Sequence, residues 1–122
     1  MPDGIPIFEE VDWTLPAPTL FGTKMRTALL MLVAVLGETY PAELSRYLRT
    51  TIASVQRTLD KLEDEGLIST RPLAVRTVTL NPTYAAGKEL RALLLRLAEG
   101  YYAYQLVKES RRTRPRRRKK AL

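Results

Sequence analysis

The sequence predicts a mainly helical domain with one small β-hairpin. Apolar residues recur at helical spacing in four segments, whereas two short segments between the third and the fourth have strand character. The chain has 122 residues, of which 45% are hydrophobic and 27% charged, which is the composition of a soluble globular protein. This length suffices for one compact domain with tails.

Residues 1–22 are predicted to form an extended N-terminal arm. This segment holds four of the eight prolines, so that a regular helix is not expected before Gly22. It also contains Trp13 and several other large apolar residues. We therefore expect the arm to lie against the domain or against a second subunit.

The first predicted helix runs from Thr23, as N-cap, to Gly37, as stop. It is apolar nearly all round, which predicts burial on more than one side. In so small a protein, such a helix suggests that part of its surface meets a partner chain.

Two further helices follow, separated by a tight turn. The second helix begins at Pro41 and ends near Leu48, and the third is capped by Thr51 and ends near Glu65, before Gly66. A helical wheel of the third helix places four apolar residues on one stripe, which is predicted to face the protein body: Ile52, Val55, Leu59 and Leu62. The same wheel leaves Ala53, Ser54, Gln56, Arg57, Asp60 and Lys61 exposed.

Two short strands, 67–71 and 75–80, are predicted around Pro72, and a long helix is predicted from Thr83 or Tyr84 to near Ser110. Leu90, Leu94, Leu97, Tyr101 and Tyr104 give this helix a heptad-like seam. The seam indicates a dimer contact or core rather than a ligand pocket. Gly100 makes a bend or break possible.

This order of elements is that of a winged helix-turn-helix. The stretch AELSRYLRTTIASVQRTLDKLEDEGLI, residues 42–68, resembles the ArsR/MarR-type motif, and the wider resemblance covers residues 20–98. The matching positions are Glu43, Leu44, Leu48, Ser54, Val55, Arg57, Leu59, Leu62, Glu63, Gly66, Leu67 and Ile68. The sequence departs from the pattern at Arg49, where a Gly or small residue is usual, at Thr50, and at the wing tip, where Pro72 to Ala74 replace the usual Gly or Asp.

The resemblance implies that residues 23–99 form a DNA-binding domain, extended by a C-terminal helix at 100–110. In a helix-turn-helix, the leading end of the second helix enters the major groove. There Gln56 could pair with adenine and Arg57 with guanine or phosphate, while the acidic residues gather at the other end. The predicted DNA contacts are Arg46, Arg49, Thr50, Thr51, Ala53, Ser54, Gln56, Arg57, Lys61, Arg71 and Arg76. For single residues a merely solvated face remains an alternative, and for Arg71 and Arg76 phosphate contact and solubility are equally supported.

The net charge of +7 resides in the predicted disordered tail, residues 111–122, which supplies eight of the twenty basic residues. The preceding 110 residues carry twelve basic and thirteen acidic groups, a balance of −1. Such a tail is suited to nucleic-acid backbone, which we favour, but also to an anionic surface or an acidic partner, or it is simply solvated.

The sequence contains no Cys and no His, which excludes disulfides, thiol nucleophiles and the usual zinc sites. No glycine-rich phosphate loop or catalytic constellation is present, so an enzyme is not expected, and neither is a cofactor or metal. The longest apolar run, residues 28–37, is too short to cross a bilayer, and a cytoplasmic location is expected.

The leading hypothesis is a sequence-specific regulator of transcription that binds double-stranded DNA as a homodimer and represses by occluding a promoter. The dimer is expected to use the first helix, the arm and the C-terminal helix. Two alternatives are a winged-helix module that docks on a partner protein and a nonspecific architectural DNA binder acting through the tail. An effector, if there is one, would be a small organic ligand or a partner.

Overall fold

The computed structural model describes residues 19–72, 76–100, 104, 105, 107 and 109. Its elements are α2 (Lys24–Leu36), α3 (Pro41–Leu48), α4 (Ile52–Asp64), β1 (Ile68–Pro72), β2 (Arg76–Leu80) and α5 (Gly87–Ala98). The mainly helical fold with one hairpin is therefore confirmed. The predictions for the arm before residue 19 and for the tail after residue 110 lie outside the described residues.

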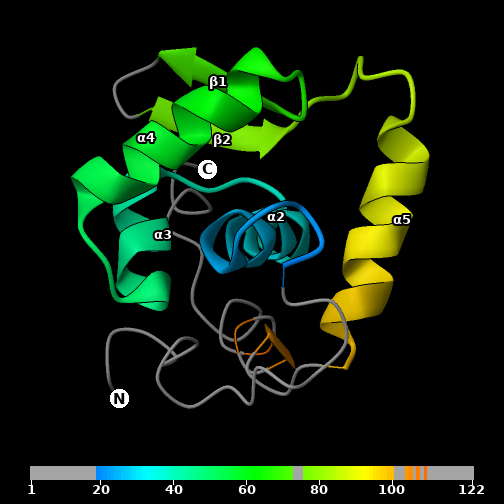
Figure 1. Cartoon of the computed structure of the whole chain (residues 1–122), viewed down its shortest axis with the longest axis horizontal. Helices are drawn as coiled ribbons and strands as arrows, with labels where there is room; N and C mark the ends of the chain where they lie inside the picture. The colour runs from blue at the N-terminus through cyan, green and yellow to red at the C-terminus, as the bar shows by residue number, and fades with distance from the viewer. Residues whose placement is uncertain (1–18, 73–75, 101–103, 106, 108, 110–122) are drawn as a thin grey trace, which may run out of the picture.

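Helix α2 forms the centre of the domain, with α3 and α4 on one side, the hairpin above and α5 on the other side (Figure 1). Residues 27–34 are all buried, at 3% exposure or less, and cover more than two consecutive turns. The predicted burial on several sides is thus confirmed, and it is achieved within one chain. Thr23 caps the helix by accepting the Arg26 N–H at 3.0 Å, and Gly37 ends it at a φ of +83°.

The α3–turn–α4 unit has the predicted boundaries because local chemistry sets them. Pro41 occupies the first position of α3, and the Thr51 hydroxyl accepts the Ser54 N–H at 3.0 Å to start α4. Between them Arg49 adopts the left-handed conformation, with φ 56° and ψ 47°. Such a backbone is ordinarily left to glycine, which explains why the motif usually has a small residue there.

The hairpin is an antiparallel pair whose register runs from Ile68 opposite Leu80 to Pro72 opposite Arg76. Each strand begins one residue later than predicted. Thr39, in the α2–α3 connection, adds a bridge to the free edge of β2 through two hydrogen bonds to Val78, of 3.0 and 2.8 Å. The wing is therefore anchored to the helical part through its second strand.

Helix α5 starts at Gly87, later than the predicted Thr83 or Tyr84. The side-chain oxygen of Asn81 accepts both the backbone N–H and the hydroxyl of Thr83, at 3.0 and 2.9 Å, and the backbone carbonyl of Asn81 accepts the Tyr84 N–H at 3.3 Å. These bonds close turns in place of a first helical turn. The helix ends at Ala98 and a turn follows at Glu99 and Gly100, so that the predicted break near Gly100 is confirmed.

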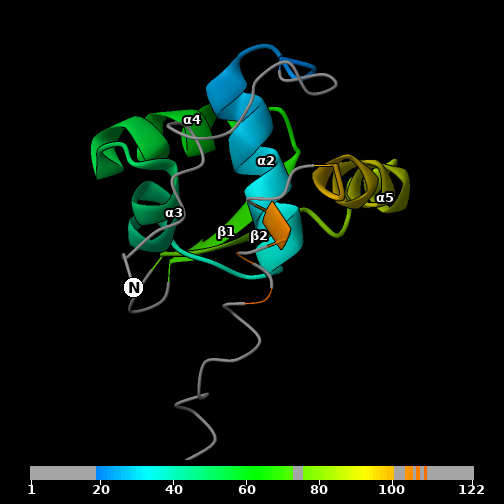
Figure 2. The same ribbon diagram turned by 90° about the horizontal axis from the view of Figure 1, so that it is seen from below.

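Helix α5 lies beside α2 in the view from below (Figure 2), and the leucines of its seam pack against the core. Leu94 is fully buried, and Leu90 and Leu97 pack against the core. Tyr104, which has helical backbone conformation, is 1% exposed and donates its hydroxyl to the Ala28 carbonyl at 3.2 Å. These residues therefore stabilise the single chain, whereas Tyr101 lies outside the described residues.

Candidate nucleic-acid interface

Helix α4 divides into a buried and an exposed face. Val55, Leu59 and Leu62 are fully buried against the body of the domain. The exposed face consists of Ala53, Gln56, Arg57, Asp60 and Lys61, with Ser54 half-buried beside it. The polar face predicted from the sequence is therefore accessible, except that Ser54 is less exposed than predicted.

The prediction that Ile52 belongs to the buried stripe is wrong, because its side chain is 45% exposed. On the helical wheel, Ile52 lies about 50° from the centre of the stripe formed by Val55, Leu59 and Leu62. As the first residue of α4 it also lies beyond the turn that packs on the core. The α4 leading end therefore presents a large apolar side chain next to its polar ones.

Three of the cations predicted to contact DNA lie near the turn between α3 and α4. Arg46 is exposed in the last turn of α3, Arg49 is exposed in the tight turn, and Arg57 is exposed on α4. Thr51 is exposed and Thr50 half-buried between them. Because the turn folds the end of α3 against the start of α4, these groups lie around one end of α4, close to its unpaired backbone N–H groups.

The other end of α4 is acidic and holds part of the wing. Arg76 of β2 bonds to Asp60 at 3.0 Å and to Glu63 at 3.4 Å, and Glu63 also accepts the Thr70 hydroxyl at 3.0 Å. These pairs fix the hairpin on α4. A further pair, Arg26 with Glu65 at 2.6 Å, ties the start of α2 to the same end.

The two wing arginines differ from each other in the structure. The Arg76 side chain is only 25% exposed and pairs with the carboxylates of Asp60 and Glu63. This intramolecular role is neither of the two, phosphate contact or solubility, that the sequence suggested. The Arg71 side chain is 64% exposed, with Glu38 at 3.5 Å, which is a long and solvated pair. Of the two, Arg71 is the one able to meet an outside anion without breaking a close pair.

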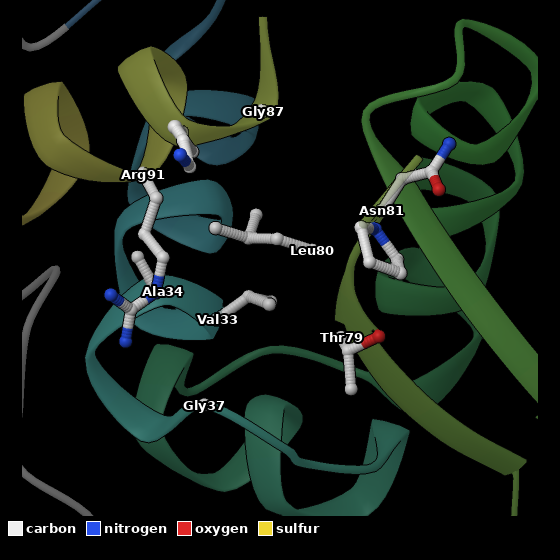
Figure 3. A pocket seen from close by; sticks show the side chains of 10 residues that line it. Val33, Ala34, Gly37, Thr79, Leu80, Asn81, Gly87 and Arg91 are labelled. Atoms are coloured by element: carbon white, nitrogen blue, oxygen red, sulfur yellow. The ribbon is translucent and has the colours of Figure 1, made fainter. Parts of the chain in front are cut away.

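A hollow of about 350 Å³ lies between α2, the end of β2 and the start of α5. Figure 3 shows Val33 of α2 and Leu80 of β2 beside it, with Arg91 of α5 at its edge. Its volume is at the lower end of the range for small-molecule sites. None of its lining residues comes from α3 or α4, so it is separate from the polar face of α4.

Within the described residues, no group of three or more Asp or Glu side chains is placed to hold a metal ion. In the same part of the chain, no helix combines the length and the apolar character that crossing a membrane requires.

The geometry of a capped helix behind a tight turn, followed by a hairpin, agrees with the comparison with protein families. Residues 23–74 match the model of the MarR family. This chain has a MarR-like winged helix. The MarR-like segment extends from the N-cap of α2 to the hairpin and includes the whole polar face of α4.

The fold is also that of a solved structure, a mutant of Lactococcus lactis ZitR, with a TM-score of 0.52 at 18% sequence identity. The match covers 81% of this chain and 66% of the ZitR chain, so this chain spans slightly less than two thirds of the length of ZitR. A comparison with curated proteins gave no significant match. The predicted winged helix-turn-helix fold is thereby confirmed, and its similarity is to the MarR family.

Sequence reasoning missed two features of this site. The only sign in the sequence that Ile52 is exposed is its place at the very start of the helix. A helical wheel predicts burial least well there, because the end of a helix can extend beyond the core. The attachment of Arg76 to Asp60 and Glu63 has no local signal, because it joins residues that are 16 and 13 positions apart.

Proposed function

We propose that this protein is a sequence-specific regulator of transcription that binds double-stranded DNA with the leading end of α4. The observation that supports it most is the distribution of charge along α4. Cations and hydroxyls surround its start, whereas Asp60, Glu63, Asp64 and Glu65 occupy its end. A duplex phosphate would be attracted to the first end and repelled by the second, which favours docking with the N-terminus in the groove.

The proposed base contacts come from Gln56 and Arg57. Glutamine pairs with two hydrogen bonds to adenine and arginine to guanine, and each such pair discriminates by about 1–3 kcal/mol. Ala53, exposed beside them, leaves room for a base edge to approach. Ser54 is half-buried, so it offers less surface to the groove than Ala53 or Gln56.

The remaining predicted contacts would position the domain on the backbone. Arg46, Arg49 and Arg71 are exposed cations, and Lys61 lies further along α4. The Thr51 hydroxyl oxygen accepts the Ser54 N–H, and its hydrogen remains available to donate to a phosphate. We assign Arg76 a different part, which is to hold the wing on α4 through Asp60 and Glu63.

We further propose that the protein acts as a homodimer and represses by covering a promoter. The middle of α2 is already buried, so the dimer would use surface on α5, where Leu93 is 43% exposed, together with the arm. A two-fold dimer places the two α4 helices in successive major grooves, about 34 Å apart.

Selection of bound duplexes from a random pool tests this proposal. The full chain should enrich a palindromic motif whose half-sites are about 10 base pairs apart, centre to centre. Enrichment of no motif, with every duplex bound equally at a given salt concentration, would contradict it.

A further inference from the structure

The exposed side chain of Ile52 lies on the candidate interface but has no part in the function proposed above. A single exposed apolar side chain is common on a protein surface and indicates nothing by itself. Ile52 is informative because of its place, the first position of the helix whose polar face is the candidate interface. Other exposed apolar residues in the described part of the chain, such as Leu20 and Leu93, lie on other elements. Ile52 is thus the large apolar residue exposed on the candidate nucleic-acid interface.

We propose that Ile52 reads the C5-methyl group of thymine in the major groove. This inference rests on the proposed function and names one base that the site selects. In the major groove, thymine is marked by its methyl group, which apolar side chains recognise by contact. A β-branched side chain has few rotamers to lose, so contact with a methyl group costs little conformational freedom.

The position of Ile52 places this contact beside the one proposed for Gln56. The two residues are one helical turn apart, at i and i+4, where side chains lie on the same face with about 5–6 Å between Cβ atoms. Successive bases along one strand are about 3.4 Å apart. The contacted thymine should therefore lie one or two base pairs from the adenine that pairs with Gln56.

The surrounding charge argues for duplex DNA, rather than a protein surface, as the occupant. Arg49 and Arg57 flank this end of α4, and Thr51, directly before Ile52, caps the helix there. The acidic residues that would repel a phosphate begin only at Asp60, two turns further along. An apolar side chain at a helix start that also carries cations complements a methyl group in a groove bordered by phosphates.

The test uses the full chain and the duplex selected from the random pool. Each thymine of the selected site is replaced in turn by deoxyuridine, which removes only the methyl group. One or two replacements per half-site should weaken binding by the wild type about fourfold, the equivalent of one buried methyl group. The Ile52→Ala variant should bind the unmodified site more weakly and lose its sensitivity to those same replacements.

Matched variants keep the test decisive. Ile52→Val should retain the sensitivity. Tyr84→Ala, which removes a large exposed side chain in the turn before α5, should leave it unchanged. The inference is overturned if selective binding persists but no deoxyuridine affects it, or if Ile52→Ala keeps the wild-type sensitivity. A change of oligomeric state in Ile52→Ala without DNA would also overturn it, by making Ile52 a protein contact. Absence of any selected motif would instead refute the proposed function, and this inference with it.

Discussion

Arg49 combines a strained backbone with a proposed phosphate contact, so its replacement should separate stability from binding. Its φ of 56° and ψ of 47° lie in the left-handed region. Arg49→Gly removes the steric penalty of that conformation, and Arg49→Ala removes the same side chain beyond Cβ but keeps the penalty. The difference between the two variants therefore isolates the backbone, whatever contacts the arginine side chain makes.

The expected magnitude follows from two opposing terms. A non-glycine residue in the left-handed region costs about 1–2 kcal/mol. Glycine avoids this cost, but it also makes the unfolded chain more flexible, which lowers the free energy of unfolding by about 0.4–1 kcal/mol. The Gly variant should therefore exceed the Ala variant in free energy of unfolding by about 0.5–1 kcal/mol, which for a domain of this size raises the Tm by roughly 3–6 °C.

DNA binding, unlike stability, should be weakened in both variants alike. Both variants lose one cation per protomer at the start of α4, so each should bind DNA more weakly and show a salt dependence whose slope is smaller by about 0.9 for each protomer bound. Thermal unfolding and titration of labelled duplex at several salt concentrations measure the two effects separately. If Arg49→Gly were no more stable than Arg49→Ala, the reasoning about the turn would be refuted, and an unchanged salt slope would remove Arg49 from the backbone contacts.

Two other perturbations address the core and the tail. Leu59→Ala, at a fully buried position of α4, should lower the free energy of unfolding by about 2–5 kcal/mol in denaturant titrations. Lys61→Ala on the exposed face should change it by less than about 0.5 kcal/mol, and equal effects would contradict the assignment of faces. Deleting residues 111–122 should weaken binding to selected and unrelated duplexes by a similar factor, as competition titrations would show, because we expect the eight cations of this tail to contact the DNA backbone without reading sequence. A change in selectivity on deletion would contradict that nonspecific part.

The sequence identified the elements whose ends are set by local chemistry. Thr23, Thr51 and Pro41 begin helices, and Gly37 and Gly66 follow the ends of theirs, because caps and positive φ angles depend on a few adjacent residues. The core stripe of α4 was found for the same reason, since its period is that of the helix itself.

Two features could not be predicted from the sequence, because they depend on residues that are distant along the chain. The start of α5 is delayed because the Asn81 side chain is drawn into turns and into a bond to the Gly66 carbonyl at 2.9 Å. The bonds of Arg76 to α4 depend on how the hairpin packs, which no local pattern encodes. For the site, the polar face could therefore be predicted, but neither the fixed wing nor the exposed Ile52.

The measurement that tests the central claim most directly is the ratio of affinities for the selected duplex and for a scrambled duplex of the same composition. In the variant with both Gln56→Ala and Arg57→Ala, this ratio should collapse towards one, because both proposed base contacts are gone. Circular dichroism and the Tm should remain close to those of the wild type, since both side chains are exposed. A folded variant that keeps the wild-type ratio would show that the leading end of α4 does not read DNA.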